Sequence, residues 1–239
     1  MLSLKIGNEQ HSCRIIRTSR KRSIGIEVSP YRGIVVHAPH SLTNHRVLEL
    51  LAGSTRWIEK RLEQLQHTPF TPRTFKTGDR FLFLGQWLEL QVLSAEIARA
   101  GIRHKENYFV ARVPYATGSD QTGEVIKSAL AKWYRTQARR IITTRIDHYA
   151  PLVGVPVPPF RINNARRRWG SCGVKGRLNF PWRLVMAPLT LVDYVVVHEL
   201  CHLLQRDHSA AFWRLVAAVL PDYRLRRRQL RMEGPFFDL

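Results

Sequence analysis

The chain has 239 residues, of which 44% are hydrophobic and 23% charged, and this composition excludes a chain that is disordered throughout. Its net charge of +20, with 30 Arg and 8 Lys against 18 acidic residues, favours acidic partners such as nucleic acid or nucleotides. The arginines are spread along the chain, so a general bias of composition explains the charge equally well.

The amino-terminal residues, MLSLKIGNEQ, lack the basic start and the apolar run of a secretory signal, and no apolar run of about 18 residues occurs in the chain. The cysteines, Cys13, Cys172 and Cys201, are odd in number and far apart, which argues against a disulfide framework. We therefore expect a cytoplasmic protein with no membrane partner.

Residues 1–115 are predicted to form a β-rich N-terminal lobe with a helical insertion. Alternating and β-branched residues predict strands at 13–17, 23–28, 33–38, 81–84, 87–93 and 108–113. The segment SPYRG is expected to turn the chain between the second and third strands, and Gly85 to join the fourth and fifth strands in a hairpin.

The helical insertion lies between the third and fourth of these strands. A cap at Thr43 is expected to open it, and its apolar pattern continues to Leu65. Gly53 is expected to divide it in two, because glycine weakens a helix interior.

Residues 116–239 are predicted to form a second lobe, and the linker-like segment 114–123 marks the boundary. Apolar residues at spacings of three and four then predict one long amphipathic helix, through Ile126, Leu130, Trp133, Ala138, Ile141, Ile142, Ile146 and Tyr149. After a proline-rich stretch, FRINNA and RLNF are predicted to pair as a hairpin around the loop RRRWGSCGVKG. No internal repeat is visible in the sequence.

A buried helix is predicted from Thr190 to about Leu204, with Thr190 and Asp193 as a capping box. His198 and His202 are four residues apart and share one helical face, so both imidazoles can reach one zinc ion. Glu199 between them completes an HExxH pattern, in which the glutamate is the general base. The alternative is a pair of hydrogen-bonded core histidines beside a salt-bridged glutamate.

The third metal ligand is less directly determined. On an unbroken helix His208 would lie on nearly the opposite side from His202, so it can bind the same ion only if the helix ends first. Asp207 or Ser209 can cap a new helix beginning near Ala210, and we therefore favour His208. The rival ligands are acidic residues downstream, namely Glu233, Asp207, Asp222 and Asp238.

Several motifs together resemble the YgjP-like family of zinc metallopeptidases, which is related more distantly to SprT-like and WLM metalloproteases. They are RKRSIGIEVSP, RWIEKRL, GDRFLFLG, LAKWYRTQA, RRRWGSCGVKGRLNFPWRLVMAP, VDYVVVHELCHLLQRDHSAAFW and LPDY. The resemblance covers nearly the whole chain. It implies an α+β fold with a zincin-like catalytic region on the HExxH helix, one Zn²⁺ held by three histidines at positions 198, 202 and 208, and a catalytic glutamate at 199.

The expected function is that of a zinc-dependent metallopeptidase that hydrolyses a peptide or protein, with Glu199 activating the zinc-bound water. Two alternatives follow from the arginines: a zinc-dependent hydrolase of nucleotides or phosphoanhydrides, and a protease that acts on nucleoprotein through a basic surface. Tyr223 is a candidate oxyanion donor or a packing residue, and Cys201 is expected to be a core thiol. The predicted hairpin would offer an edge strand to an extended peptide.

Overall fold

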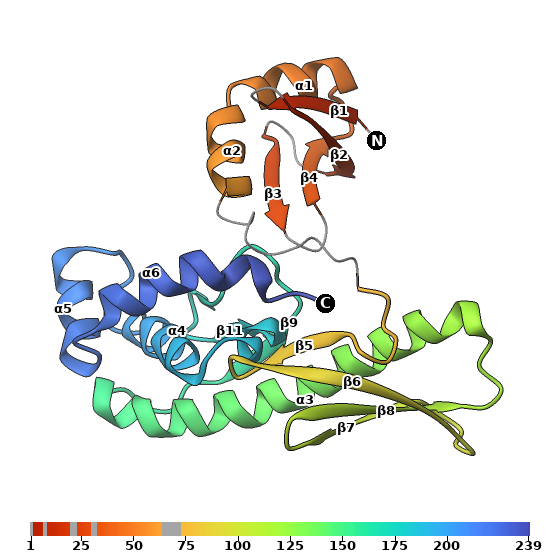
Figure 1. Cartoon of the computed structure of the whole chain (residues 1–239). Helices are drawn as coiled ribbons and strands as arrows, with labels where there is room; N and C mark the ends of the chain where they lie inside the picture. Colours follow the sequence, from red (N-terminus) through yellow and green to blue (C-terminus); the bar gives the residue numbers. More distant parts are fainter. Residues whose placement is uncertain (1, 7–8, 20–22, 30–32, 64–72) are drawn as a thin grey trace. The chain divides into compact units, whose positions relative to one another are not determined.

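The computed structural model describes residues 2–6, 9–19, 23–29, 33–63 and 73–239. The chain divides into two compact units, Met1–Arg73 and Thr74–Leu239 (Figure 1). No helix in the described ranges is long and apolar enough to span a membrane.

The first unit contains a four-stranded sheet in the order β1-β2-β4-β3. The strands are β1 (Leu2–Ile6), β2 (Glu9–Thr18), β3 (Gly25–Ser29) and β4 (Gly33–Pro39). The central pair β2 and β4 is parallel, and both outer pairs are antiparallel. The first three predicted strands are confirmed as β2, β3 and β4, whereas β1 was not predicted. The predicted SPYRG turn falls mostly on residues 30–32, outside the described ranges.

Two short helices follow this sheet, α1 (Asn44–Ala52) and α2 (Thr55–Glu63). The predicted cap is confirmed, because the hydroxyl of Thr43 accepts a hydrogen bond from the Arg46 amide (3.2 Å). Gly53 is the C-terminal cap of α1 and divides the helical insertion as predicted, while Leu65 lies outside the described residues.

The second unit begins with another four-stranded sheet, in the order β5-β6-β8-β7. Its strands are β5 (Arg80–Phe83), β6 (Gln86–Ala95), β7 (Gly101–Lys105) and β8 (Tyr108–Pro114). The predicted hairpin is confirmed: Leu84 and Gly85 both have positive φ and join β5 to β6. Strand directions repeat those of the first sheet, with a parallel central pair and antiparallel outer pairs.

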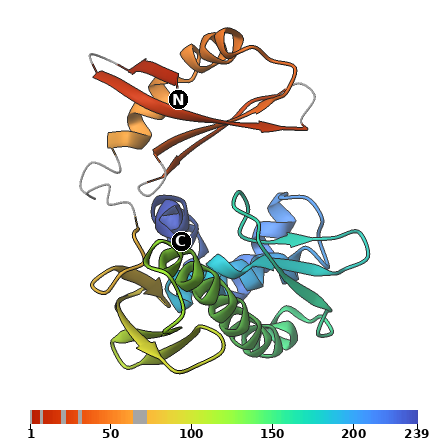
Figure 2. The same ribbon diagram turned by 90° about the vertical axis from the view of Figure 1, so that its right-hand side faces the viewer.

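The predicted long helix is confirmed as α3 (Ser119–Val153). Figures 1 and 2 show that it runs the length of the second unit, with the β5–β8 sheet beside its first half and the later helices beside its second half. Its apolar stripe is buried, and the hydroxyl of Tyr134 donates to the Leu82 carbonyl (2.6 Å). The helix therefore connects the sheet to the rest of the unit.

A small three-stranded sheet follows, built from β9 (Phe160–Asn163), β10 (Ser171–Cys172) and β11 (Leu178–Pro181). The predicted hairpin of FRINNA and RLNF is wrong, because β9 and β11 are parallel. The antiparallel partner of β11 is the two-residue β10, which lies at the edge of the sheet. The short 3₁₀ helix η1 (Trp182–Met186) leads on to the helical region.

The chain ends with α4 (Leu189–Cys201), α5 (Ala210–Val219), α6 (Tyr223–Glu233) and the 3₁₀ helix η2 (Gly234–Phe236). Helix α4 is buried on nearly all sides, as its apolar sequence predicts. The predicted capping box is wrong: Pro188 occupies the cap position, and Asp193 instead accepts two hydrogen bonds from Arg145 of α3 (2.6 and 3.1 Å).

The main hydrophobic core takes all its buried members from residues after 74. It unites the β5–β8 sheet with α3 and α4, through side chains such as Phe81, Phe109 and Tyr134. The compact units therefore divide the chain at residues 73/74, whereas the sequence placed the lobe boundary at 115/116. The fold as a whole is a mixture of helices and several sheets, which agrees with the predicted α+β class.

Candidate metal centre

Helix α4 places His198 and Glu199 in its last turn, and His202 is its C-terminal cap. Glu199 is buried, and His198 and His202 are partly buried. After His202 the chain leaves the helix: the amides of Leu204 and Gln205 both donate to the Cys201 carbonyl in a closing turn. The predicted interruption before His208 is therefore present.

The loop between α4 and α5 brings the third histidine back to the first two. The Nε2 atom of His198 lies 3.2 Å from the Nε2 atom of His202 and 3.0 Å from that of His208. His208 is exposed, and Ser209 after it occupies the cap position of α5. The carboxylate of Asp207 accepts hydrogen bonds from the Gln205 side chain (2.6 Å) and the Ser209 amide (3.3 Å), so Asp207 supports the loop.

Aromatic rings of α5 form the floor on which the histidines rest. The buried ring of Phe212 has its centroid 4.9, 4.5 and 4.8 Å from those of His198, His202 and His208, respectively. The neighbouring Trp213 stacks on His208, with centroids 5.6 Å apart. The first turn of α5 therefore fixes the orientation of all three imidazoles by packing.

Burial favours the neutral form of two of the imidazoles, those of His198 and His202. It is the main cause that lowers the pKa of His198 to about 3, with smaller contributions from the nearby histidines and Arg227. Burial likewise lowers the pKa of His202, although a hydrogen bond to the Gln205 carbonyl acts in the opposite direction. Neutral imidazole nitrogens carry the lone pairs that a metal ion requires.

Hydrogen bonding also determines which nitrogen of His202 faces the other histidines. Its Nδ1–H donates to the Gln205 carbonyl (3.1 Å), which leaves Nε2 as the unprotonated atom directed at His198. Among the described residues, His198 Nδ1 and Glu199 Oε2 are buried polar atoms without a hydrogen-bond partner. Burial raises the pKa of Glu199 to about 8, and the positive charge of Arg168 opposes this shift.

The backbone of Gly170 lies against the Glu199 carboxyl group. A Cβ atom at position 170 would lie 2.3 Å from Oε1 and 2.5 Å from Cγ of Glu199, well inside contact distance. Glycine is therefore required if Glu199 is to keep this conformation. The sequence placed Gly170 in the loop RRRWGSCGVKG between two predicted strands, but nothing in it connected Gly170 with Glu199.

Arg206 ties the histidine loop to the turn after β10. Its guanidinium group donates to the carbonyls of Gly173 (2.8 Å) and Val174 (2.9 Å), and it lies 3.4 Å from the Cys172 sulfur. This contact was missed from the sequence, where Arg206 is one of many arginines.

The end of the chain holds the other side of the same loop. Asp238 accepts a hydrogen bond from the buried Arg183 (2.5 Å) and also pairs with Arg166. The ring of Phe237 packs edge-to-face on Trp169, the first residue of WGSC (5.6 Å between centroids). Contacts on both sides thus support the segment that carries Gly170.

The rival acidic ligands lie in other interactions. Asp207 bonds within the loop, Asp222 pairs with Arg226, Glu233 accepts from Gln229, and Asp238 pairs with the two arginines described above. Among the described residues, the group of histidine, cysteine and acidic side chains able to hold a metal ion is the triad of His198, His202 and His208.

Two further candidates take structural positions. Tyr223 is buried, stacks on Trp213 (5.2 Å between centroids) and accepts a hydrogen bond from the Arg224 side chain (3.3 Å). Cys201 is buried in the core, and burial raises the pKa of its thiol to about 12.

The donor set fits a zinc ion. In a tetrahedral site with metal–nitrogen bonds of about 2.1 Å, two ligand nitrogens are about 3.4 Å apart, close to the 3.0 and 3.2 Å separations from His198. All three ligand atoms lie within 4.8 Å of one another. Three neutral imidazoles form a known zinc ligand set, and they leave a coordination position open.

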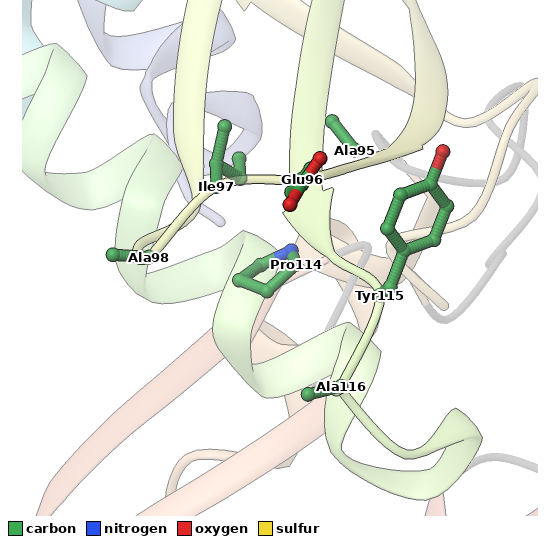
Figure 3. Close-up of a pocket in the computed structure, with 7 residues that line it drawn as sticks. All are labelled: Ala95, Glu96, Ile97, Ala98, Pro114, Tyr115 and Ala116. Carbon is green, nitrogen blue, oxygen red and sulfur yellow. The ribbon is translucent and has the colours of Figure 1, made fainter.

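A separate depression lies at the far end of the β5–β8 sheet (Figure 3). It is lined by Ala95, Glu96, Ile97, Ala98, Pro114, Tyr115 and Ala116. The hairpin before β6 lies against Pro188, the cap residue of α4, whereas the depression lies at the other end of β6, at Ala95. The depression is therefore remote from the start of α4. Its lining contains one carboxylate, that of Glu96, and one exposed phenol, that of Tyr115. It therefore offers fewer metal-binding or reactive groups than the histidine triad does.

The site is typical of a metal-dependent hydrolase, because three imidazoles converge at the end of a helix that also carries a buried glutamate. Residues 22–233 match the model of the YgjP-like metallopeptidase domain, and the chain therefore belongs to the YgjP-like family of metallopeptidases. No curated protein matches the sequence.

One solved structure is similar to part of the chain: the crystal structure of the metallopeptidase zymogen of Pyrococcus abyssi abylysin. The similarity has 24% sequence identity and a TM-score of 0.35, and it covers 38% of this chain and 91% of the other. A TM-score of this size does not establish a common fold.

Proposed function

We propose that this metallopeptidase uses one zinc ion, held by His198, His202 and His208 in a zincin-like arrangement, with Glu199 as the general base. The observation that carries the proposal is the convergence of three Nε2 atoms at the end of α4, whose last turn also carries the buried Glu199. A bound zinc ion would polarise the scissile carbonyl group and lower the pKa of water toward about 7.

The chain's own groups would divide the remaining work. A Glu199 carboxylate oxygen takes the proton of the attacking water and returns it to the leaving amine. Gly170 leaves room for that carboxyl group, and Phe212 fixes the imidazoles by packing. The edge strand β10 beside α4 is the segment to which an extended peptide substrate would add.

Metal analysis combined with peptide hydrolysis tests this proposal. The purified chain is expected to contain one zinc ion and to cleave casein or a fluorogenic peptide, with loss of activity in a chelator and recovery with zinc. Nucleotide hydrolysis is measured in parallel. Chelator-sensitive nucleotide turnover without peptide turnover would favour the phosphoanhydride alternative over peptide hydrolysis.

Two substitutions separate the proposed roles. Glu199→Gln should retain stoichiometric zinc and lose peptide turnover, because the amide cannot accept the proton. His208→Ala should lose zinc, because it removes a ligand. Full activity of the Glu199→Gln protein, or full zinc content of the His208→Ala protein, would contradict the corresponding assignment.

A further inference from the structure

Helix α6, which packs against α4, presents a row of arginines. Arg224, Arg227, Arg228 and Arg231 recur at spacings of three and four, so they lie along one face of the helix, and all four are exposed. Arg226 lies outside this row and pairs with Asp222 (2.9 Å). The row places several positive charges on a helix that packs against α4.

One member of the row, Arg227, is held directly at the wall of the site. Its guanidinium carbon lies 4.8 Å from the centre of the Trp213 ring. The same ring stacks on His208 (5.6 Å) and lies 5.9 Å from His198. A single aromatic side chain therefore separates the charge of Arg227 from two of the three imidazoles.

The interactions of Arg227 leave its hydrogen-bonding groups available. In the described part of the chain it forms no ion pair or hydrogen bond, and its contact is with the face of an indole ring. Stacking on an aromatic ring orients a guanidinium group without occupying its N–H donors. Two acidic groups next to the triad in sequence are otherwise placed: Glu199 is buried, and Asp207 is bonded within its loop.

We infer that Arg227 forms a subsite for a carboxylate group of the peptide substrate, next to the bond that is cleaved. This inference rests on the proposed function and specifies its substrate class, namely peptides with an acidic residue or a free carboxyl terminus near the scissile bond. A guanidinium group binds a carboxylate through two parallel hydrogen bonds, which gives both affinity and orientation.

A peptide carboxylate fits this site better than the phosphates of a nucleic acid. Binding along a nucleic acid requires a succession of available cations. In the α6 row, however, Arg224 donates to Tyr223, and Arg231 has other interactions. One guanidinium group at the wall of the site matches one carboxylate of a substrate that occupies the triad.

The test uses the full-length, zinc-loaded protein and matched fluorogenic peptides. In one pair of peptides Glu replaces Gln beside the scissile bond, and in another a free carboxyl terminus replaces an amide. The wild type should cleave the member with the carboxylate at least about 10-fold faster in kcat/KM, mostly through a lower KM. The pair that shows the preference identifies the source of the carboxylate.

Two substitutions on α6 test the assignment to Arg227. Arg227→Met should reduce kcat/KM for the acidic peptide to the level of its neutral partner. Arg228→Met, which removes the same charge one position along the helix, should retain the preference. Equal rates for both members of each pair in the wild type, or loss of the preference in both variants, would refute the subsite.

Binding measurements keep this result distinct from the proposed function. Fluorescence anisotropy of the same peptides on the Glu199→Gln protein reports the preference without turnover. Absence of wild-type cleavage would overturn the peptidase mechanism, while equal binding of acidic and neutral peptides would overturn the subsite. A single-stranded DNA oligonucleotide is also tested as a competitor of the acidic peptide. If the oligonucleotide displaces the peptide, and both arginine variants lose this displacement equally, α6 is a nucleic-acid surface. That result would also overturn the subsite.

Discussion

Gly170 occupies a position at which any side chain would collide with Glu199, the proposed general base. In Gly170→Ala the new Cβ would meet the end of the Glu199 side chain, which is flexible and can move aside, so the fold should be retained. A displacement of about 1 Å can cost on the order of 10²-fold in rate. We therefore expect kcat to fall by about that factor while zinc content is unchanged.

The matched control for this prediction lies in the same loop. A Cβ at Gly173 would lie 3.4 Å from the Arg177 carbonyl oxygen, an ordinary contact, so Gly173→Ala should retain activity. Steady-state kinetics and metal analysis on both variants provide the measurement. An active Gly170→Ala protein would show that Glu199 does not need the observed conformation.

At the residue scale, the sequence predicted that the three histidines come together and missed the residues that support them. Spacing was sufficient for His198 and His202, because four positions along a helix correspond to one face, whereas the role of Glu199 stays a prediction. Gly170 and Arg206 act through contacts between segments that are distant in sequence. Such contacts leave no local pattern, so only the structure could reveal them.

At the element scale, helices were predicted better than strand pairing. Periodicity and length sufficed for α3, whereas β7 was missed and the β9–β11 pair was assigned the wrong direction. Local pattern does not encode strand direction, because parallel and antiparallel neighbours can have the same alternation. Asp193 shows the same limitation. The sequence predicted that it caps the start of α4, but its partner is Arg145 on α3.

The loop between α4 and α5 depends on Arg206 for its anchorage. Arg206→Ala removes the hydrogen bonds to the Gly173 and Val174 carbonyls, so His208 should be held less firmly. Loss of groups that support metal ligands typically costs 10- to 100-fold in metal affinity, roughly. We expect a zinc dissociation constant weaker by about that factor, measured by competition with a chromogenic chelator.

Arg214 provides the comparison for this loop. It is an exposed residue of α5 without a hydrogen bond to the described residues, so Arg214→Ala removes the same charge without releasing the loop. Its zinc affinity should match that of the wild type. Equal weakening in both variants would attribute the effect to charge rather than to anchorage.

The ion pair of Asp238 with Arg183 joins the end of the chain to η1. The side chain of Arg183 is only 4% exposed, so Asp238→Ala would leave a buried cation without its carboxylate. Removing one partner of a buried pair costs about 3–5 kcal/mol, and we expect the free energy of unfolding to fall by that amount. Asp222→Ala removes the more exposed pair with Arg226, and it should lower the free energy of unfolding by less than about 1 kcal/mol.

Urea denaturation followed by near-ultraviolet circular dichroism measures both variants. The aromatic residues Trp169 and Phe237 lie beside the ion pair and report on its loss. Equal stability of the Asp238→Ala and Asp222→Ala proteins would show that solvent or another group replaces the carboxylate at Arg183.

At the scale of the whole molecule, the two four-stranded sheets have the same topology. Their strand orders and directions match, and the second, third and fourth strands have equal lengths of 10, 5 and 7 residues in both. The sequence shows no repeat, because strand order depends on pairing and on alternating burial rather than on residue identity. Among the described residues, the core that supports the histidine triad includes strands of the second sheet and none of the first.

This division predicts how the chain can be cut. A fragment of residues 74–239 contains the whole of that core, so it should fold cooperatively and bind one zinc ion. A fragment of residues 116–239 lacks β5–β8 and would expose Tyr134, which packs against Phe83 and Phe109 and bonds to Leu82. It should therefore fail to fold.

Thermal unfolding and metal analysis of the two fragments distinguish the two boundaries. A cooperative transition with bound zinc in residues 116–239 would support the boundary at 115/116 that the sequence suggested. Failure of residues 74–239 alone would mean that the first unit contributes to folding of the second. The buried apolar residues of α3 pack against the β5–β8 sheet along one part of the helix and against α4 along another. We therefore expect the cut at 73/74, which keeps both contacts, to preserve the site.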